Sequence, residues 1–213
     1  MRTIPKKADQ IFVALRDRIV YLEYLPGTLL SEKELCEEFR VSRTPLREAI
    51  RRLEDMGLVK SIPRFGTHVT AIDINEIRCA FEVKKKLEAL AGALAARRIS
   101  KDRLEELRRI TEEVEAYPEG AENRRLIELD ARFHEVIYEA TQNSILKEFL
   151  ENLHSRCARL WASNLSVVIP PEEVVAQLRK IYNALKQGDE EMAAKVLEDH
   201  VNFFIDRLKE KLL

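Results

Sequence analysis

The chain has 213 residues, a formal net charge of −1, 46% hydrophobic residues and 34% charged residues. This length fits one large or two small domains with a buried core, and the near-zero net charge gives no overall sign of nucleic-acid binding. The three cysteines, Cys36, Cys79 and Cys157, are far apart in sequence, which argues against a disulfide framework and a cysteine zinc site. No apolar run approaches the ~18 residues of a membrane-spanning helix, and the N-terminus does not resemble a signal peptide. We therefore expect a cytoplasmic protein that is not bound to a membrane.

The first predicted elements are two helices. Apolar residues recur every three or four positions in Ala8–Glu23, a spacing that predicts a helix, and Pro26-Gly27 ends the pattern. Ser31 and Glu34 form a capping box, in which each side chain can satisfy an unpaired backbone amide at the start of a helix. A second, short helix is therefore expected from this point to Phe39.

A third helix and a hairpin follow. Ser42 is expected to cap the third helix, and Gly57 to end it. Two strands are expected at Leu58–Ile62 and Thr67–Thr70, joined by the basic turn Pro63–Gly66. Two helices with a tight turn between them, followed by a basic hairpin, predict a winged helix-turn-helix.

A stripe of arginines lies on the third helix. Arg43, Arg47 and Arg51 are four residues apart and so share one helix face. Like charges on one stripe repel each other, and a polyanion would relieve that repulsion. The alternative is a solvated basic helix in a protein–protein module, but the ordered caps, turn and hairpin favour DNA. The expected DNA-contacting residues are Lys33, Ser42, Arg43, Thr44, Arg47, Arg64 and Gly66.

The remainder of the chain, from about residue 73, predicts helices only. They are expected at residues 75–98, 101–116, 122–141, 143–165, 171–187 and 189–211, with breaks that include Tyr117–Gly120 and Val168–Pro171. Six helices with short connections indicate an antiparallel bundle. We therefore expect a mainly α protein, with a winged helix-turn-helix domain at 1–72 and an all-α domain at 73–213.

The two parts together resemble a known family. The stretch LPGTLLSEKELCEEFRVSRTPLREAIRRLEDMGLVKSIPRFGTHV is similar to the GntR family of bacterial transcription regulators, and the helical part resembles the FCD effector domain of the FadR-type branch. The resemblance implies a homodimer on a short palindromic operator, with a small metabolite sensed in the helical domain. It also implies DNA contacts at Arg43, Thr44, Arg47 and Gly66. Lys33 stands where an arginine is common, which keeps the charge but loses the two-pronged guanidinium.

A second candidate site lies in the helical part. Asp130 and His134 are four residues apart on one helix, and a carboxylate beside an imidazole suits a divalent metal ion. His200, in the last helix, would join them if that helix packs alongside. An ordinary salt link or a core histidine is the alternative for such a pair.

The FCD resemblance implies a zinc or nickel site built from one aspartate and three histidines. Asp130, His134 and His200 match three of these four, but the third histidine falls on Leu178, which cannot bind a metal. Two interpretations stay open: a three-ligand site completed by another group, or a pocket that has lost its metal. His154 is a conceivable substitute, although its spacing equally suits packing.

The effector is expected to be a small carboxylate. FCD proteins often hold it with an arginine in the first bundle helix, and Lys84 occupies that position here. The leading hypothesis is a non-enzymatic regulator, a repressor, whose operator affinity depends on this effector. The alternatives are a metal-dependent hydrolase that uses Asp130, His134 and His200, and a metal-free regulator that responds to an acyl thioester.

Overall fold

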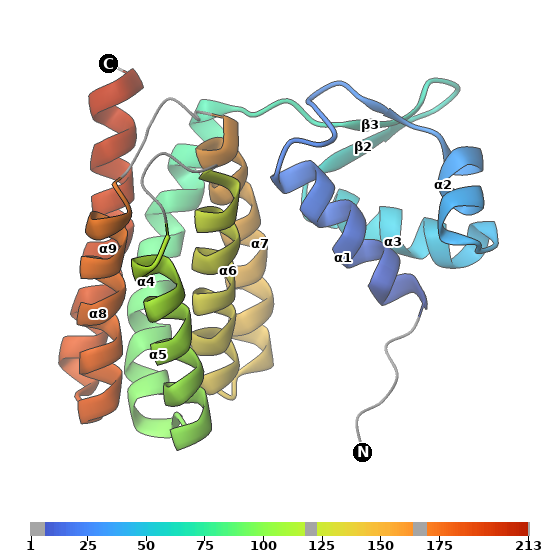
Figure 1. Ribbon diagram of the computed structural model, residues 1–213. Helices are drawn as coiled ribbons and strands as arrows, with labels where there is room; N and C mark the ends of the chain where they lie inside the picture. Colours follow the sequence, from blue (N-terminus) through green and yellow to red (C-terminus); the bar gives the residue numbers. More distant parts are fainter. Residues whose placement is uncertain (1–6, 118–122, 164–169, 213) are drawn as a thin grey trace. The chain divides into compact units, whose positions relative to one another are not determined.

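A computed structural model describes residues 7–117, 123–163 and 170–212 (Figure 1). The chain divides into two compact units, one formed by residues 1–74 with 158–163, the other by residues 75–157 with 164–213. In the described residues, no helix has both the length and the apolar character needed to cross a membrane. Two undescribed internal segments, 118–122 and 164–169, contain the breaks predicted around Pro118–Gly120 and at Val168. Those predictions therefore lie outside the described residues.

The first unit is built from three helices and a small sheet. The helices are α1 (Lys7–Val20), α2 (Glu32–Phe39) and α3 (Arg43–Asp55). Ser31 caps α2 as expected, because its hydroxyl accepts a hydrogen bond from the Glu34 amide at 3.3 Å. Ser42 is the residue that precedes α3, but its side chain makes no capping hydrogen bond. Ser42 is thus the N-cap residue, as predicted, but the expectation that its hydroxyl caps the helix was wrong.

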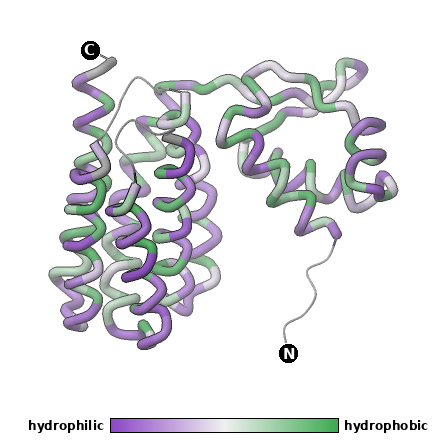
Figure 2. The backbone as a smooth tube through the Cα atoms, in the orientation of Figure 1, coloured by the Kyte–Doolittle hydropathy of each residue, from purple (hydrophilic) through white to green (hydrophobic). Residues whose placement is uncertain are grey.

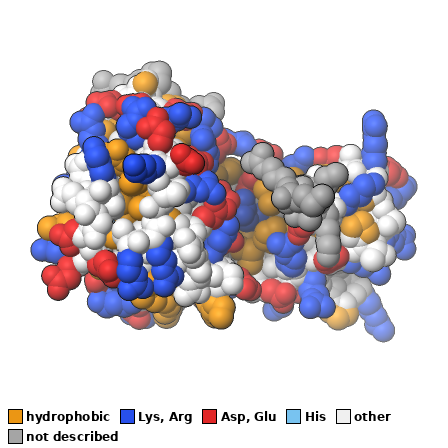
Figure 3. Space-filling view, turned by 90° about the horizontal axis from the view of Figure 1, so that it is seen from below, with side chains coloured by type: hydrophobic (Ala, Val, Ile, Leu, Met, Phe, Trp, Pro, Cys, Tyr) orange, Lys and Arg blue, Asp and Glu red, His pale blue; other side chains and the backbone are white. Residues whose placement is uncertain are grey.

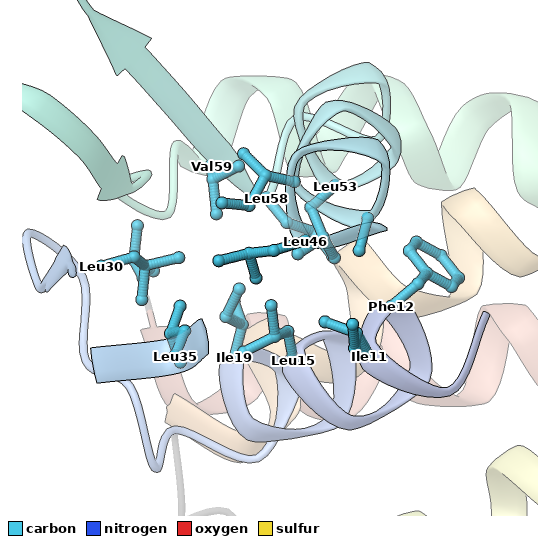
Figure 4. Close-up of a cluster of buried hydrophobic side chains, with 13 residues drawn as sticks. Ile11, Phe12, Leu15, Ile19, Leu30, Leu35, Leu46, Leu53, Leu58 and Val59 are labelled. Carbon is cyan, nitrogen blue, oxygen red and sulfur yellow. The ribbon is translucent and has the colours of Figure 1, made fainter. Parts of the chain in front are cut away.

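One hydrophobic core holds this unit together (Figure 4). Ile11, Leu15 and Ile19 on α1 face Leu46 and Leu53 on α3, and all five side chains are at most 2% exposed. Their three- and four-residue spacing puts the apolar groups of each helix on one face. Packing α1 against α3 in this way leaves the opposite face of α3, with its arginines, open to solvent.

The sheet has three antiparallel strands in the order β1-β3-β2, where β1 is Leu29–Leu30, β2 is Val59–Ile62 and β3 is Gly66–Val69. The hairpin was predicted, but β1 was not, because two residues carry no alternating pattern. At the turn, Gly66 has φ of +91° and a Cβ there would lie 2.7 Å from Leu29 Cδ1. The positive φ favours glycine at this position, whereas the exposed Leu29 side chain could move aside for a Cβ.

The second unit is a bundle of antiparallel helices. Their bounds are α4 (Ile74–Arg98), α5 (Lys101–Glu115), α6 (Asn123–Ala140), α7 (Ser144–Ser163), α8 (Pro171–Gln187) and α9 (Glu190–Leu212). The last residues of α7, 158–163, are counted with the first unit. Each agrees with a predicted helix to within about two residues where the chain is described. Figure 2 shows hydrophobic and hydrophilic positions alternating along the helices, as expected for elements with one buried face.

Helix α4 touches α9 backbone to backbone. A Cβ on Gly92 would lie 2.5 Å from the Ala193 carbonyl oxygen and 2.8 Å from Leu197 Cδ1, so only glycine allows this approach. One further turn along α9 brings His200 to the bundle interior. The close contact therefore fixes the distance between the helix of Lys84 and the helix of His200.

Candidate functional site

The candidate DNA-binding surface lies on α2, α3 and the β2–β3 turn. All seven residues expected to contact DNA are exposed: Lys33, Ser42, Arg43, Thr44, Arg47, Arg64 and Gly66. Phe65, between the last two, is 73% exposed, which is unusual for so large an apolar side chain. On the face of the molecule seen in Figure 3, Lys and Arg side chains are interspersed with Asp and Glu, so any basic surface is local.

Arg47 is not a free cation on this surface. Its Nε lies 3.1 Å from both carboxylate oxygens of Glu32 on α2, and its second guanidinium nitrogen lies 3.0 Å from one of them. This hydrogen bonding raises the pKa of Arg47. This ion pair links α3 to α2 across the turn and orients the guanidinium. The sequence spacing did not predict that Arg47 would pair with Glu32.

The second candidate site is a polar cluster inside the bundle. Asp130 and His134 lie one turn apart on α6, and His200 reaches them from α9. His134 Nε2 is 3.2 Å from His200 Nε2, and Asp130 Oδ1 is 3.8 Å and 3.6 Å from these two nitrogens. The structure thus brings together the three residues that the sequence suggested as metal ligands, and all three are buried.

His154, on α7, completes this group. Its Nε2 lies 3.9 Å from Asp130 Oδ2, and its ring centroid is 5.0 Å from that of His134. One ligand atom from each of Asp130, His134 and His154 lies within 4.8 Å of the others. Leu178, at the position on α8 where a histidine was expected, is fully buried and apolar. The additional histidine beside the cluster comes from α7 instead. Three of the chain's four histidines therefore meet here.

Several polar atoms of the cluster lack partners. Asp130 Oδ1, His200 Nδ1 and both ring nitrogens of His154 are buried without a hydrogen bond to any described residue. Buried polar atoms are normally paired, so Asp130 Oδ1 and one ring nitrogen of His154 fit a missing ligand, whereas His200 Nδ1 is the ring nitrogen opposite the one that faces His134. Two nitrogens bound to one tetrahedral zinc ion at about 2.0–2.1 Å lie about 3.3 Å apart, close to the 3.2 Å between His134 and His200. One carboxylate and three imidazoles fit a divalent ion such as zinc or nickel.

The protonation states also suit a metal. Burial lowers the pKa of His154 to about 3, helped by the charge of Lys84, and burial lowers the pKa of His200 as well. Burial opposes ionisation of Asp130, but His134, His200 and His154 together hold the pKa of its carboxyl below its usual range. Metal binding requires neutral imidazoles and an ionised carboxylate, and the cluster provides both.

Lys84 lies against this cluster, where it pairs with a residue that sequence analysis missed. Its Nζ donates to Glu88 Oε1, one turn further along α4, and both side chains are buried. Tyr138 on α6 also donates to Glu88 Oε1, at 2.5 Å. Burial alone would raise the pKa of Glu88, but Lys84 and His134 hold it well below its usual range. The four-residue spacing of Lys84 and Glu88 was the available signal, but it suits an exposed salt bridge equally well.

Comparison with known proteins identifies both domains. The model of the gntR family of bacterial regulatory proteins matches residues 7–69, and the FCD domain model matches residues 79–203. The chain belongs to the GntR family. This GntR-family protein has the helix-turn-helix and the FCD domain in the order that its sequence predicted.

The relatives of this GntR-family protein are named as transcription regulators. The repressor RspR of Escherichia coli is 28% identical over 193 residues, 91% of this chain and 85% of the relative. A Paenarthrobacter nicotinovorans protein named "Probable D-xylose utilization operon transcriptional repressor" is 30% identical over 179 residues, 84% of this chain and 78% of the relative. Among solved structures, E. coli McbR/YncC has the same fold, with a TM-score of 0.84, 24% identity, and coverage of 99% of this chain and 100% of that one.

Proposed function

We propose that this protein is a transcription repressor that binds a palindromic operator through α3 and the β2–β3 wing. The exposed first turn of α3 would enter the major groove, where Arg43 and Arg47 meet base edges or phosphates. Ser42 and Thr44 would contact phosphates, and Lys33 would reach the backbone from α2. Arg64 and Gly66 at the wing tip would approach the minor groove. The proposal assigns DNA binding to residues 1–72 and effector sensing to residues 73–213.

We further propose that the helical domain holds a divalent metal ion between Asp130, His134, His200 and His154. The observation that supports it most is the convergence of these four side chains, from α6, α7 and α9, around unpaired buried atoms. His154 would supply the imidazole that Leu178 does not. When bound, the ion would offer a Lewis-acidic partner to an effector carboxylate.

The effector is proposed to be a small organic acid. The ammonium of Lys84 lies beside the cluster, and an acid that displaced Glu88 from it would find a buried cation there. An effector changes operator affinity only if it binds more tightly to one arrangement of the two DNA-binding domains than to another. The bound acid would therefore act by stabilising one arrangement, without any chemical step.

A homodimer is part of the proposal. Among the exposed large apolar side chains of the bundle, four lie on two helices: Val83 and Leu90 on α4, and Ile145 and Phe149 on α7. Glu76 of α4 and Arg156 of α7 pair at 3.8 Å, which places these two helices side by side. Exposed apolar residues gathered on neighbouring helices are typical of a protein interface. Phe149→Asp is expected to give a monomer by sedimentation, whereas Phe65→Asp, an equally exposed phenylalanine on the wing, leaves the dimer intact.

The alternatives have less support. A hydrolase would need a general base beside the metal, and Glu135, next to His134 in sequence, is exposed while His134 is buried. The relatives are named as regulators rather than enzymes. A metal-free thioester sensor would leave the unpaired atoms of Asp130 and His154 without a role.

The metal is tested by counting ions per chain in protein purified without a metal-binding tag, supplied with zinc or nickel, and dialysed. We expect about one ion in the wild type and in His68→Ala, a histidine outside the cluster, but none in His134→Ala. An ion that His134→Ala retains, or a wild type that retains none after refolding with added metal, contradicts the proposed site.

DNA binding is tested separately. Genomic fragments selected by the wild-type protein should contain a palindrome, and Arg43→Ala should lose preference for it at a stated ionic strength, since phosphate contacts make affinity depend on salt. Fragments without a shared palindrome contradict the proposed operator.

A further inference from the structure

Beside the cluster lies a carboxylate outside the proposed set of metal ligands. Glu88 is fully buried on α4, and its Oε1 accepts hydrogen bonds from Lys84 and from Tyr138. The same oxygen lies 3.2 Å from His134 Nδ1. Glu88 therefore contacts the ring nitrogen of His134 opposite to the one that faces Asp130 and His200.

The hydrogen atoms around His134 Nδ1 can be assigned from these contacts. Tyr138 has one hydroxyl hydrogen, and it points to Glu88 Oε1 at 2.5 Å. The Tyr138 oxygen, 3.3 Å from His134 Nδ1, therefore presents a lone pair to the ring. Since the Glu88 carboxylate also presents only lone pairs, both neighbours of Nδ1 are acceptors, and Nδ1 must carry the hydrogen.

A neutral imidazole protonated at Nδ1 has its free lone pair at Nε2. This is the atom 3.2 Å from His200 Nε2 and 3.8 Å from Asp130 Oδ1. We infer that Glu88 is a positioning residue, which with Tyr138 selects the tautomer of His134 that binds metal and aims its Nε2 at the ligand cluster. The inference rests on the metal site of the proposed function. Carboxylates that accept from the far nitrogen of a histidine ligand orient the ring and raise its basicity.

Lys84 has a defined part in this arrangement. It neutralises Glu88, so the carboxylate adds orientation without adding net negative charge beside the ion. Lys84 and Glu88 can therefore be exchanged together for a neutral pair of similar size, Lys84→Met with Glu88→Gln. A glutamine can donate to Nδ1 as well as accept from it, so it no longer selects one tautomer.

The test uses two readouts on the full chain. Long-range ¹H–¹⁵N correlation spectra of metal-free protein report the tautomer of His134, and competition with a chromophoric chelator reports zinc affinity. The wild type is expected to show the Nδ1-protonated form. The double variant is expected to show a mixture of tautomers and an affinity about 10- to 100-fold weaker. The matched control is Lys86→Met with Glu82→Gln, the same change on the exposed side of α4, which should alter neither readout.

Three results separate the inference from the metal proposal. An Nε2-protonated His134 in the metal-free wild type overturns the inference, and this measurement needs no variant to fold. A double variant that folds and keeps the wild-type tautomer and zinc affinity also overturns it. If the wild type shows the Nδ1-protonated form but binds no metal, the tautomer assignment stands while the metal proposal, and with it the role of Glu88 at a metal, fails.

Discussion

Replacing Lys84 by methionine is expected to destabilise the helical domain strongly. The Nζ of Lys84 pairs directly with Glu88, and the two side chains are 5% and 0% exposed. Removing one partner of a buried ion pair costs about 3–5 kcal/mol, because the remaining charge stays buried without compensation. Glu88 would still accept from Tyr138, so we expect a loss near the lower end, about 3 kcal/mol.

The assay is urea unfolding of chelator-treated protein, followed by helical circular dichroism. Lys86→Met is the control: Lys86 pairs with Glu198 at 2.6 Å on the surface, with its side chain 67% exposed. Exposed pairs contribute about 0–1 kcal/mol, so this variant should unfold close to the wild type. Lys84→Met with Glu88→Gln should recover most of the loss, since it leaves no unpaired charge.

The result that refutes this reasoning is a Lys84→Met variant within about 1 kcal/mol of the wild type. Glu88 would then be neutral or otherwise compensated, and Lys84 would not be required as its counter-charge. In that case an effector carboxylate could pair with Lys84 without first displacing Glu88.

Three further predictions concern other parts of the chain. Arg47→Ala should reduce preference for the operator over unrelated DNA about 5- to 100-fold, measured by competition binding; equal losses on both DNAs would show a phosphate contact alone. Gly92→Ala should lower the free energy of unfolding by about 1 kcal/mol, because the clash with Ala193 outweighs the gain of about 1 kcal/mol in helix propensity; unchanged urea stability would contradict it. His154 should cost metal-free protein about 2 kcal/mol of stability between pH 7 and pH 5, since its pKa of about 3 keeps it neutral while the unfolded chain takes up a proton below about pH 6.5, and His200, whose pKa is also lowered, adds to the loss. The loss should shrink in His154→Gln, and an unchanged slope would refute the assignment.

The sequence by itself determined the elements and their order. Apolar residues at three- and four-residue spacing, the capping box at Ser31 and the glycine after α3 are local signals, and they gave the helix-turn-helix and six bundle helices close to their observed bounds. The same local rule put Asp130 and His134 on one face of α6. Spacing along one helix needs no knowledge of its neighbours.

Only the tertiary structure decided what those faces meet. The pairing of Arg47 with Glu32, the strand Leu29–Leu30 and the place of His154 each depend on residues from separate elements. Glu88 is the clearest case. In sequence it is one acidic residue in a charged helix. The packing of α4 against α6 makes it a buried acceptor for Tyr138, fifty residues further along the chain, and places it against His134. Helix periodicity fixes which residues share a face, whereas long-range packing fixes which faces touch, and ligand clusters form where several faces meet.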